Sequence, residues 1–242
     1  SDVPLFDNKS FAYDGIADYV NVADNNNLSF GDGSTDSPFS ILFWVKIEPT
    51  TQSSNVFIGK SNLAPNREYA IGMFGGSRKI RFFIKNQGGN SQQSIDSTTT
   101  ISNDTWYHIA VTYDGSGGNN AADGMTIYIN GNSETPTNVL KNSYTAMNNT
   151  STNFTIGKYN TVSSNIAGNI DEVSIFNTEL SASDVSTIYG TGVPNDILSI
   201  SGLVSWWRCG DGDTSPTLTD NGSGGNDGTM TNFTTFSTDV PT

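Results

Sequence analysis

Hydrophobic and polar residues alternate along much of the chain, in short segments that end at Gly, Asn, Ser or Asp. A period of two is typical of strands that bury one face, and a series of such strands separated by turns is typical of a sandwich or barrel. The pattern predicts strands near residues 10–13, 18–22, 39–47, 55–59, 69–73, 79–85, 92–97, 106–113, 124–130, 154–158, 168–177, 203–209 and 228–233. The segments 114–124 and 220–228 are so rich in Gly and Asn that we expect loops there.

The alternation also assigns faces, because neighbouring side chains of a strand point to opposite sides. In segment 106–113, one face carries Tyr107, Ile109, Val111 and Tyr113, and the other carries Trp106, His108, Ala110 and Thr112. In segment 79–85, one face carries Ile80, Phe82 and Ile84, and the other carries Lys79, Arg81, Phe83 and Lys85. In segment 203–209, we expect Leu203, Trp207 and Cys209 in the core, with Trp206 and Arg208 on the opposite side.

One short helix is expected near residues 182–189, in the stretch LSASDVSTIY. Ser181 can cap the first turn, and Asp184 three residues later places an acidic group at the helix N-terminus. The helix should end by Gly190, which is followed by Gly192 and Pro194.

Composition narrows the function classes. Only 34% of the 242 residues are hydrophobic and 14% are charged, and much of the remainder is Gly, Asn, Ser and Thr, which favours an all-β protein with many loops. The net charge of −13 argues against nucleic-acid binding, because phosphates would be repelled. A single cysteine, Cys209, allows no internal disulfide, and no apolar run is long enough for membrane insertion. The chain begins with Ser1, so we expect it to be processed or to be a segment of a longer protein.

Several motifs resemble LamG-like modules, the laminin G-type branch of the concanavalin A-like jelly rolls. The stretch SFAYDGIADYVNV resembles their opening, and PFSILFWVKIEP resembles their next core strand. WYHIAVTYDG followed by MTIYINGN resembles the central hairpin, and IAGNIDEVSIFNTELSASDVSTIY resembles the closing strand and helix. The resemblance covers residues 10–190 and implies a two-sheet antiparallel jelly-roll sandwich.

The segment LVSWWRCGDG…DNGSGGNDGTM comes last here, whereas a similar segment comes first in many bacterial modules of this family. An orphan strand exposing two tryptophans would aggregate, and the termini of a domain often lie close together. We therefore expect one circularly permuted LamG-like domain over residues 1–242, with 203–233 completing the sandwich. Structural proteins of tailed bacteriophages carry similar endings, and the echo between FSTDVP and SDVP at the two ends resembles their linkers.

No catalytic constellation is visible in the sequence. The one histidine, His108, lies inside a predicted strand and is interpreted as a packed structural residue. The glucanases of this superfamily use acidic residues at alternating positions of a strand, whereas Asp171 and Glu172 are adjacent and face opposite sides. We expect no enzymatic activity.

Metal and ligand sites remain open at this level. Asp18 and Asp171 share strand faces with core residues, so their carboxylates are expected to point inward. Because a buried carboxylate needs a partner, one structural Ca²⁺ is a candidate cofactor. Asp220 and Asn226 are candidates for further ligands. Hydrogen bonds to backbone amides of turns are the equally weighted alternative. One strand face carries Lys79, Arg81, Phe83 and Lys85. It is either a solvated surface or a contact for an acidic glycan or for an acidic copy of the chain. Trp206 is a candidate for stacking on a sugar, although packing is the commoner use of a tryptophan.

These observations leave three functions in competition. The first is a virion structural protein of a tailed bacteriophage, a capsid-decoration or fibre module that forms oligomers, meets other virion proteins and binds surface glycans. The second is a carbohydrate-binding lectin module of a secreted or cell-surface bacterial protein. The third, a fragment of a glucanase-like enzyme, has the least support, because the spaced carboxylate pair is missing.

Overall fold

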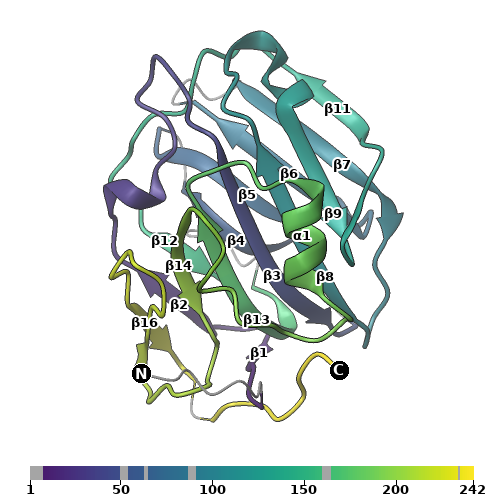
Figure 1. Cartoon of the computed structure of the whole chain (residues 1–242), viewed down its shortest axis with the longest axis vertical. Coiled ribbons are helices and arrows are strands. Elements are labelled where there is room, and N and C mark those ends of the chain that lie inside the picture. Colours follow the sequence, from purple (N-terminus) through teal and green to yellow (C-terminus); the bar gives the residue numbers. More distant parts are fainter. Residues whose placement is uncertain (1–7, 50–53, 63–64, 87–90, 160–164, 234) are drawn as a thin grey trace.

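The computed structural model describes residues 8–49, 54–62, 65–86, 91–159, 165–233 and 235–242, which form a sandwich of two antiparallel sheets (Figure 1). One sheet has seven strands, in the order β1 (Phe11–Asp14), β13 (Ala167–Phe176), β3 (Phe39–Ile47), β8 (Trp106–Tyr113), β9 (Met125–Ile129) and β10 (Asn132–Ser133), with β14 (Leu203–Trp207) also paired to β13. The other has nine, in the order β11 (Thr137–Lys141), β7 (Gln92–Thr100), β6 (Lys79–Lys85), β5 (Arg67–Met73), β4 (Asn55–Ser61), β12 (Phe154–Ile156), β2 (Tyr19–Val22), β16 (Gly228–Thr231) and β15 (Thr217–Leu218). The predicted all-β sandwich is confirmed.

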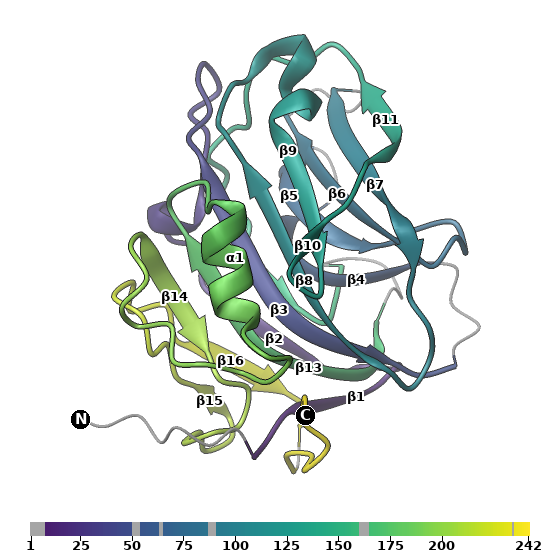
Figure 2. The same ribbon diagram turned by 45° about the vertical axis from the view of Figure 1, so that its right-hand side comes forward.

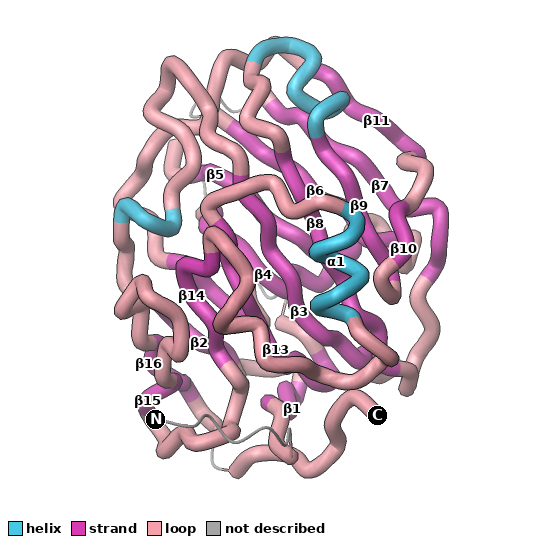
Figure 3. Tube along the Cα trace, in the orientation of Figure 1, coloured by secondary structure: helices cyan, strands magenta, loops and turns pink. Residues whose placement is uncertain are grey.

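Each predicted strand is present, with its ends shifted by a few residues. The sequence pattern missed β10, β11 and β15, because two of them are two residues long and β11 is an edge strand with exposed apolar side chains. One expected loop also differs: residues 118–124 form a 3-10 helix that buries Ala121 and Ala122. Figure 3 shows how little of the chain is helical.

The main core lies between the two sheets and contains the faces that the alternation predicts. Ile109, Val111 and Tyr113 of β8 and Ile80, Phe82 and Ile84 of β6 all point into it. Aromatic rings meet across the layers: the ring of Phe43 lies 5.9 Å from that of Phe57, and the ring of Phe39 lies 5.9 Å from that of Phe82.

A bulge in β13 separates its two acidic residues. The pairing with β3 shifts register between Asp171 and Ser174, and Glu172 has a φ of 49°, so both Ile170 and Val173 point into the core. Asp171 is fully buried. Burial raises the pKa of two core groups, the Tyr13 hydroxyl and the Cys209 thiol, and the charge of Asp171 adds to both shifts.

The α-helix α1 (Ala182–Tyr189) covers the outer face of the seven-stranded sheet (Figures 1 and 2). The Ser181 side chain accepts a hydrogen bond from the Asp184 backbone N–H, the Asp184 carboxylate accepts one from the Ser181 backbone N–H, and the helix ends at Gly190, as predicted. Val185 and Ile188 enter a second apolar cluster that also contains Trp206. No helix in the described part of the chain has the length and apolar character needed to cross a membrane.

The C-terminal segment adds strands to both sheets. Strand β14 pairs with β13, and β16 pairs with β2. Trp207 and Cys209 are fully buried in the main core, and Trp206 faces the opposite side, as expected. The expectation for Leu203 is wrong: a register irregularity in the β13–β14 pairing turns Val204 into the main core and Leu203 onto the cluster under α1.

The Gly-rich loop after β15 packs tightly against β14. The backbone N–H of Gly224 donates to the Val204 carbonyl at 2.7 Å. At Gly222, a β-carbon would approach the same carbonyl oxygen to 2.5 Å, so a larger residue would push the loop away.

Candidate functional site: an aromatic and cationic groove

A groove of about 260 Å³ lies on the face of the nine-stranded sheet that points away from the core. Strand β6 positions its central side chains, because Ile80, Phe82 and Ile84 enter the core and the alternate residues must point outward. The lining is Ser54, Val56, Phe74, Arg81, Phe83, Lys85, Gln92 and Tyr159.

The floor of the groove is aromatic. Phe83 packs with Val56 and Ala70 in a small apolar cluster, and Phe74 and Tyr159 lie against this cluster, both half-buried. The rings of Phe74 and Phe83 are tilted by 59° with centroids 5.7 Å apart. The Tyr159 hydroxyl lies 3.3 Å from the hydroxyl of Ser61 on β4, and this contact links the segment after β12 to β4.

Two cations stand over these rings. The Arg81 guanidinium carbon lies 5.8 Å from the centroid of Phe74, and the Lys85 Nζ lies 4.6 Å from that of Phe83. Arg81 donates two hydrogen bonds to Asp96 on β7, from Nε at 2.6 Å and from Nη2 at 2.8 Å, and this carboxylate raises the pKa of Arg81. Asp96 also accepts from Asn138 Nδ2 at 3.0 Å, so the Arg81 head is fixed in place.

Lys85 is in a different electrostatic situation. Burial lowers the pKa of its ammonium to about 8, and the positive charges of Arg67 and Arg81 contribute to the shift. The charged form is therefore less stable here than in water, because it is partly desolvated and surrounded by like charges.

Three of the four residues predicted on this face come together in the groove, namely Arg81, Phe83 and Lys85. Lys79 does not line it, and its Nζ donates to the Thr137 hydroxyl at 3.2 Å. Phe74 and Tyr159 were missed, because both lie just outside strands, where the period of two assigns no face. The sequence signal that could have found them is an aromatic residue directly after a predicted strand.

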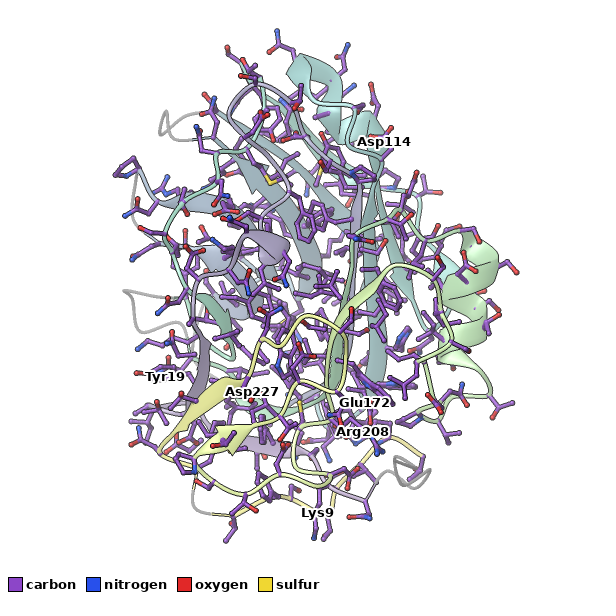
Figure 4. The ribbon with its side chains drawn as sticks, turned by 60° about the vertical axis from the view of Figure 1, so that its left-hand side comes forward. Lys9, Tyr19, Asp114, Glu172, Arg208 and Asp227 are labelled. Carbon is purple, nitrogen blue, oxygen red and sulfur yellow. The ribbon has the colours of Figure 1, made fainter. Side chains whose placement is uncertain are left out.

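Trp206 has no exposed ring face for a sugar. It is 2% exposed, and its indole Nε1 donates a hydrogen bond to the Glu172 carboxylate. Arg208 donates from Nε to the same carboxylate at 3.1 Å and lies over the indole ring, with its guanidinium carbon 5.3 Å from the centroid. Figure 4 shows Glu172 and Arg208 side by side near the C-terminal segment. The predicted contact role of Trp206 is thus replaced by packing in the layer between the sheet and α1.

The four candidate calcium ligands do not form one site. Asp220 Oδ1 accepts from the backbone N–H of Trp206 and of Gly222, and its Oδ2 accepts from that of Asn226. The Asn226 side chain donates to Ser205 and Asn27. The alternative interpretation, hydrogen bonds to turn backbone amides, therefore describes Asp220, whereas the side chain of Asn226 bonds other side chains.

The other two candidates are also engaged by the backbone. Asp18 Oδ2 accepts from the Asp14 N–H at 2.9 Å, and Asp171 Oδ1 accepts from the Glu172 N–H at 2.8 Å. Burial raises the pKa of Asp18. Within the described residues, no group of three or more His, Cys, Asp or Glu side chains is placed to hold a metal ion.

Comparison with known proteins places this geometry in context. The model of the family described as the concanavalin A-like lectin/glucanases superfamily matches residues 14–186. No curated protein matches the chain.

Solved structures share the fold. A Bacteroides ovatus ATCC 8483 protein, described as a candidate carbohydrate-binding protein, superposes with a TM-score of 0.69 at 19% identity, over 98% of this chain and 62% of that one. This chain therefore spans less than two thirds of the length of the Bacteroides protein. Domain 4 of AbnA, a GH43 extracellular arabinanase of Geobacillus stearothermophilus solved with arabinotriose, superposes with a TM-score of 0.52 at 19% identity, over 75% of this chain and 76% of that one. Botulinum neurotoxin type C, whose cell entry depends on two ganglioside molecules, superposes with a TM-score of 0.51 at 25% identity. The match covers 72% of this chain and 41% of the toxin chain.

Proposed function

This chain belongs to the concanavalin A-like lectin/glucanases superfamily, and from that premise we propose that it is a carbohydrate-binding module whose ligand lies in the groove of Phe74, Phe83 and Tyr159. The observation that carries the proposal is the combination of half-exposed aromatic rings with polar groups around one concave surface. Sugars offer apolar C–H faces and a rim of hydroxyls, and such a surface complements both.

The lining supplies each kind of contact. Phe74 and Tyr159 present ring surface beside the buried Phe83, and Ser54 and Gln92 present hydroxyl and amide groups. A volume of about 260 Å³ is slightly below the range typical of small-ligand sites, about 300–1,000 Å³. An open groove of this size suits a short stretch of a glycan better than a deeply enclosed ligand.

Proteins of the same fold support this class of ligand. The Bacteroides structure is described as a candidate carbohydrate-binding protein, and the Geobacillus domain was solved with arabinotriose. We propose binding without turnover, because Asp171 contacts the core side while Glu172 is held by Trp206 and Arg208 on the outer side, so the two carboxyls do not face one substrate.

Binding to a glycan array tests the proposal, with the wild-type protein beside the variants Phe74→Ala and Tyr159→Ala. Removing one stacking ring should lower the affinity for a bound glycan about tenfold. Tyr189→Ala is the matched control, because Tyr189 is a half-buried aromatic residue on α1, stacked on Trp44 over the other sheet. Binding that survives both groove variants, or that the control weakens equally, would place the site elsewhere.

A second candidate function is a virion structural module of a tailed phage, a decoration or fibre protein that assembles with copies of itself. It is favoured by the position of segment 203–233 after the helix and by the echo between FSTDVP and SDVP at the two ends. Glycan binding is compatible with this role as well as with a secreted or cell-surface protein. Antibodies against the chain should then label purified phage particles, and light scattering should show an oligomer; absence of both would leave the lectin module alone.

A further inference from the structure

Resting on that function, we propose that the groove selects an anionic saccharide, and that a carboxylate or sulfate group of the sugar binds beside Lys85 while the rings of Phe74 and Tyr159 hold its apolar face. Three features of the groove favour such a ligand: where its cations lie, which of them already have partners, and how Lys85 is solvated.

Cations gather around the groove. Arg81 and Lys85 line it from β6, and Arg67 at the start of β5 is close enough for its charge to act on Lys85. In a chain with a net charge of −13, this is an unusual local excess of positive charge. A neutral sugar can only accept hydrogen bonds from these groups, whereas an anionic one is also attracted by their charge.

These cations differ in whether a carboxylate already neutralises them. Arg81 is paired with Asp96, and elsewhere Lys60, Lys141 and Arg208 are in salt bridges too. Among the residues that the structure describes, neither Lys85 nor Arg67 forms a salt bridge, although the chain is rich in acidic groups. The Lys85 end of the groove is therefore a pair of like charges without a counterion from the described protein.

The surroundings of Lys85 make a bound anion favourable. From β6, Phe83 lies beneath its Nζ and Arg81 repels it; from β5, Arg67 repels it; from β7, Gln92 lies opposite and is uncharged. The carboxylate of Asp96 on β7 is already bonded to Arg81. An anionic ligand would supply the missing opposite charge in a partly desolvated place, where charge-assisted hydrogen bonds are strongest.

Binding and protonation of Lys85 should consequently be coupled. With the pKa of the free groove at about 8, roughly nine tenths of Lys85 is charged at about pH 7 and only about 3% at about pH 9.5. If the anion binds only the charged form, its affinity should fall about 30-fold between these two pH values. Arg67 and Arg81 stay charged over the whole range, so they contribute no such dependence.

The experiment uses the full chain on an array of paired glycans, in which uronic, sialylated and sulfated saccharides stand beside neutral saccharides of the same backbone. The paired arms separate carboxylate from sulfate as the recognised group. We expect anionic members to bind at least tenfold more tightly than their neutral counterparts, and the difference should shrink with added salt because of screening. The best ligand is then titrated calorimetrically from about pH 7 to about pH 9.5.

Two variants make the result specific. Lys85→Arg keeps the positive charge without the low pKa, so it should keep the selectivity for anions and lose most of the 30-fold pH dependence. Lys85→Gln should lose the selectivity at every pH. Lys79→Gln is the matched control on the same strand face, because Lys79 bonds Thr137 outside the groove and should change neither quantity.

The outcomes separate the two proposals. If neutral and anionic glycans bind equally well and without pH dependence, the inference is overturned and the binding function stands. If the pH dependence persists in Lys85→Arg, another group carries it and the inference again fails. If no glycan binds at all, the proposed function itself is refuted.

Discussion

Replacing Trp207 by alanine tests whether the C-terminal segment belongs to the core of the sandwich. Trp207 on β14 is fully buried, and its ring stacks on Phe154 of the opposite sheet with centroids 5.3 Å apart and planes 18° apart. Its indole Nε1 donates to the Asn226 carbonyl at 2.9 Å. One side chain thus joins β14, β12 and the Gly-rich loop.

These contacts give the expected decrease in the free energy of unfolding. Removing a buried Trp side chain costs about 3–5 kcal/mol through lost transfer free energy and the cavity left behind. The Asn226 carbonyl also loses its donor, which costs about 1–3 kcal/mol if no water replaces it. The sum is about 4–8 kcal/mol, a large share of the 5–15 kcal/mol that folded domains typically have. At about 2–4 °C per kcal/mol for a chain of this size, such a loss lowers the melting midpoint by about 8–32 °C.

The assay is calorimetric and urea-induced unfolding of Trp207→Ala beside two comparison variants. Trp207→Phe keeps a ring against Phe154 and loses the hydrogen bond, so it should cost about 1–3 kcal/mol. Trp106→Ala is the control, because Trp106 is half-buried and donates to Asp239 on an exposed segment. An unchanged midpoint in Trp207→Ala, or a separate minor transition that alone responds, would refute the view that residues 203–233 complete the sandwich.

The remaining predictions concern pH, calcium and catalysis. Burial lowers the pKa of His108 from 6.5 to about 3, so between these pH values only the unfolded chain takes up this proton. The free energy of unfolding should therefore fall by about 1.4 kcal/mol per pH unit from about pH 6.5 towards about pH 3. Urea titrations of His108→Gln should show a smaller fall, and a pH profile identical to that of the wild type would contradict the prediction. If one structural Ca²⁺ binds, as the sequence alone led us to expect, a hundredfold excess over its dissociation constant should raise the free energy of unfolding by about 2.7 kcal/mol; equal melting curves in EDTA and in Ca²⁺ would remove this expectation. Polysaccharide hydrolysis should be undetectable, and turnover that Asp171→Asn or Glu172→Gln abolishes without unfolding would overturn the non-enzymatic proposal.

The alternation of side chains was sufficient to predict the long strands and most of their buried faces, because each long strand buries one face against the other layer; it did not predict how the strands pair. It predicted that Phe83 shares a face with Arg81 and Lys85, and the groove contains all three. The period fails where one extra residue enters a strand: the irregularity near Val204 moves Leu203 to the other side of the sheet.

The alternation of side chains along a strand does not predict which side chains meet between the layers of the fold. Trp206 points away from the main core, as the alternation indicates, yet α1 and its flanking loop bury it. Phe74 and Tyr159 reach the groove from positions outside strands, so their place depends on how β4, β5 and β12 are assembled. Local sequence therefore predicted the strand face of the groove, and tertiary packing decided its walls.

The meeting of the two ends of the described chain has a mechanical consequence. Ser10 and Ser237 exchange two backbone hydrogen bonds, of 3.0 and 2.9 Å, and the Ser10 hydroxyl donates to the Asp239 carbonyl at 2.7 Å. Because this pairing is antiparallel, a force that pulls the ends apart breaks these bonds one after another, in the unzipping geometry. It does not shear the long strands along their whole length at once. We therefore expect tension on the two ends to separate Ser10 from Ser237 before it breaks the pairing of β3, β8 and β13.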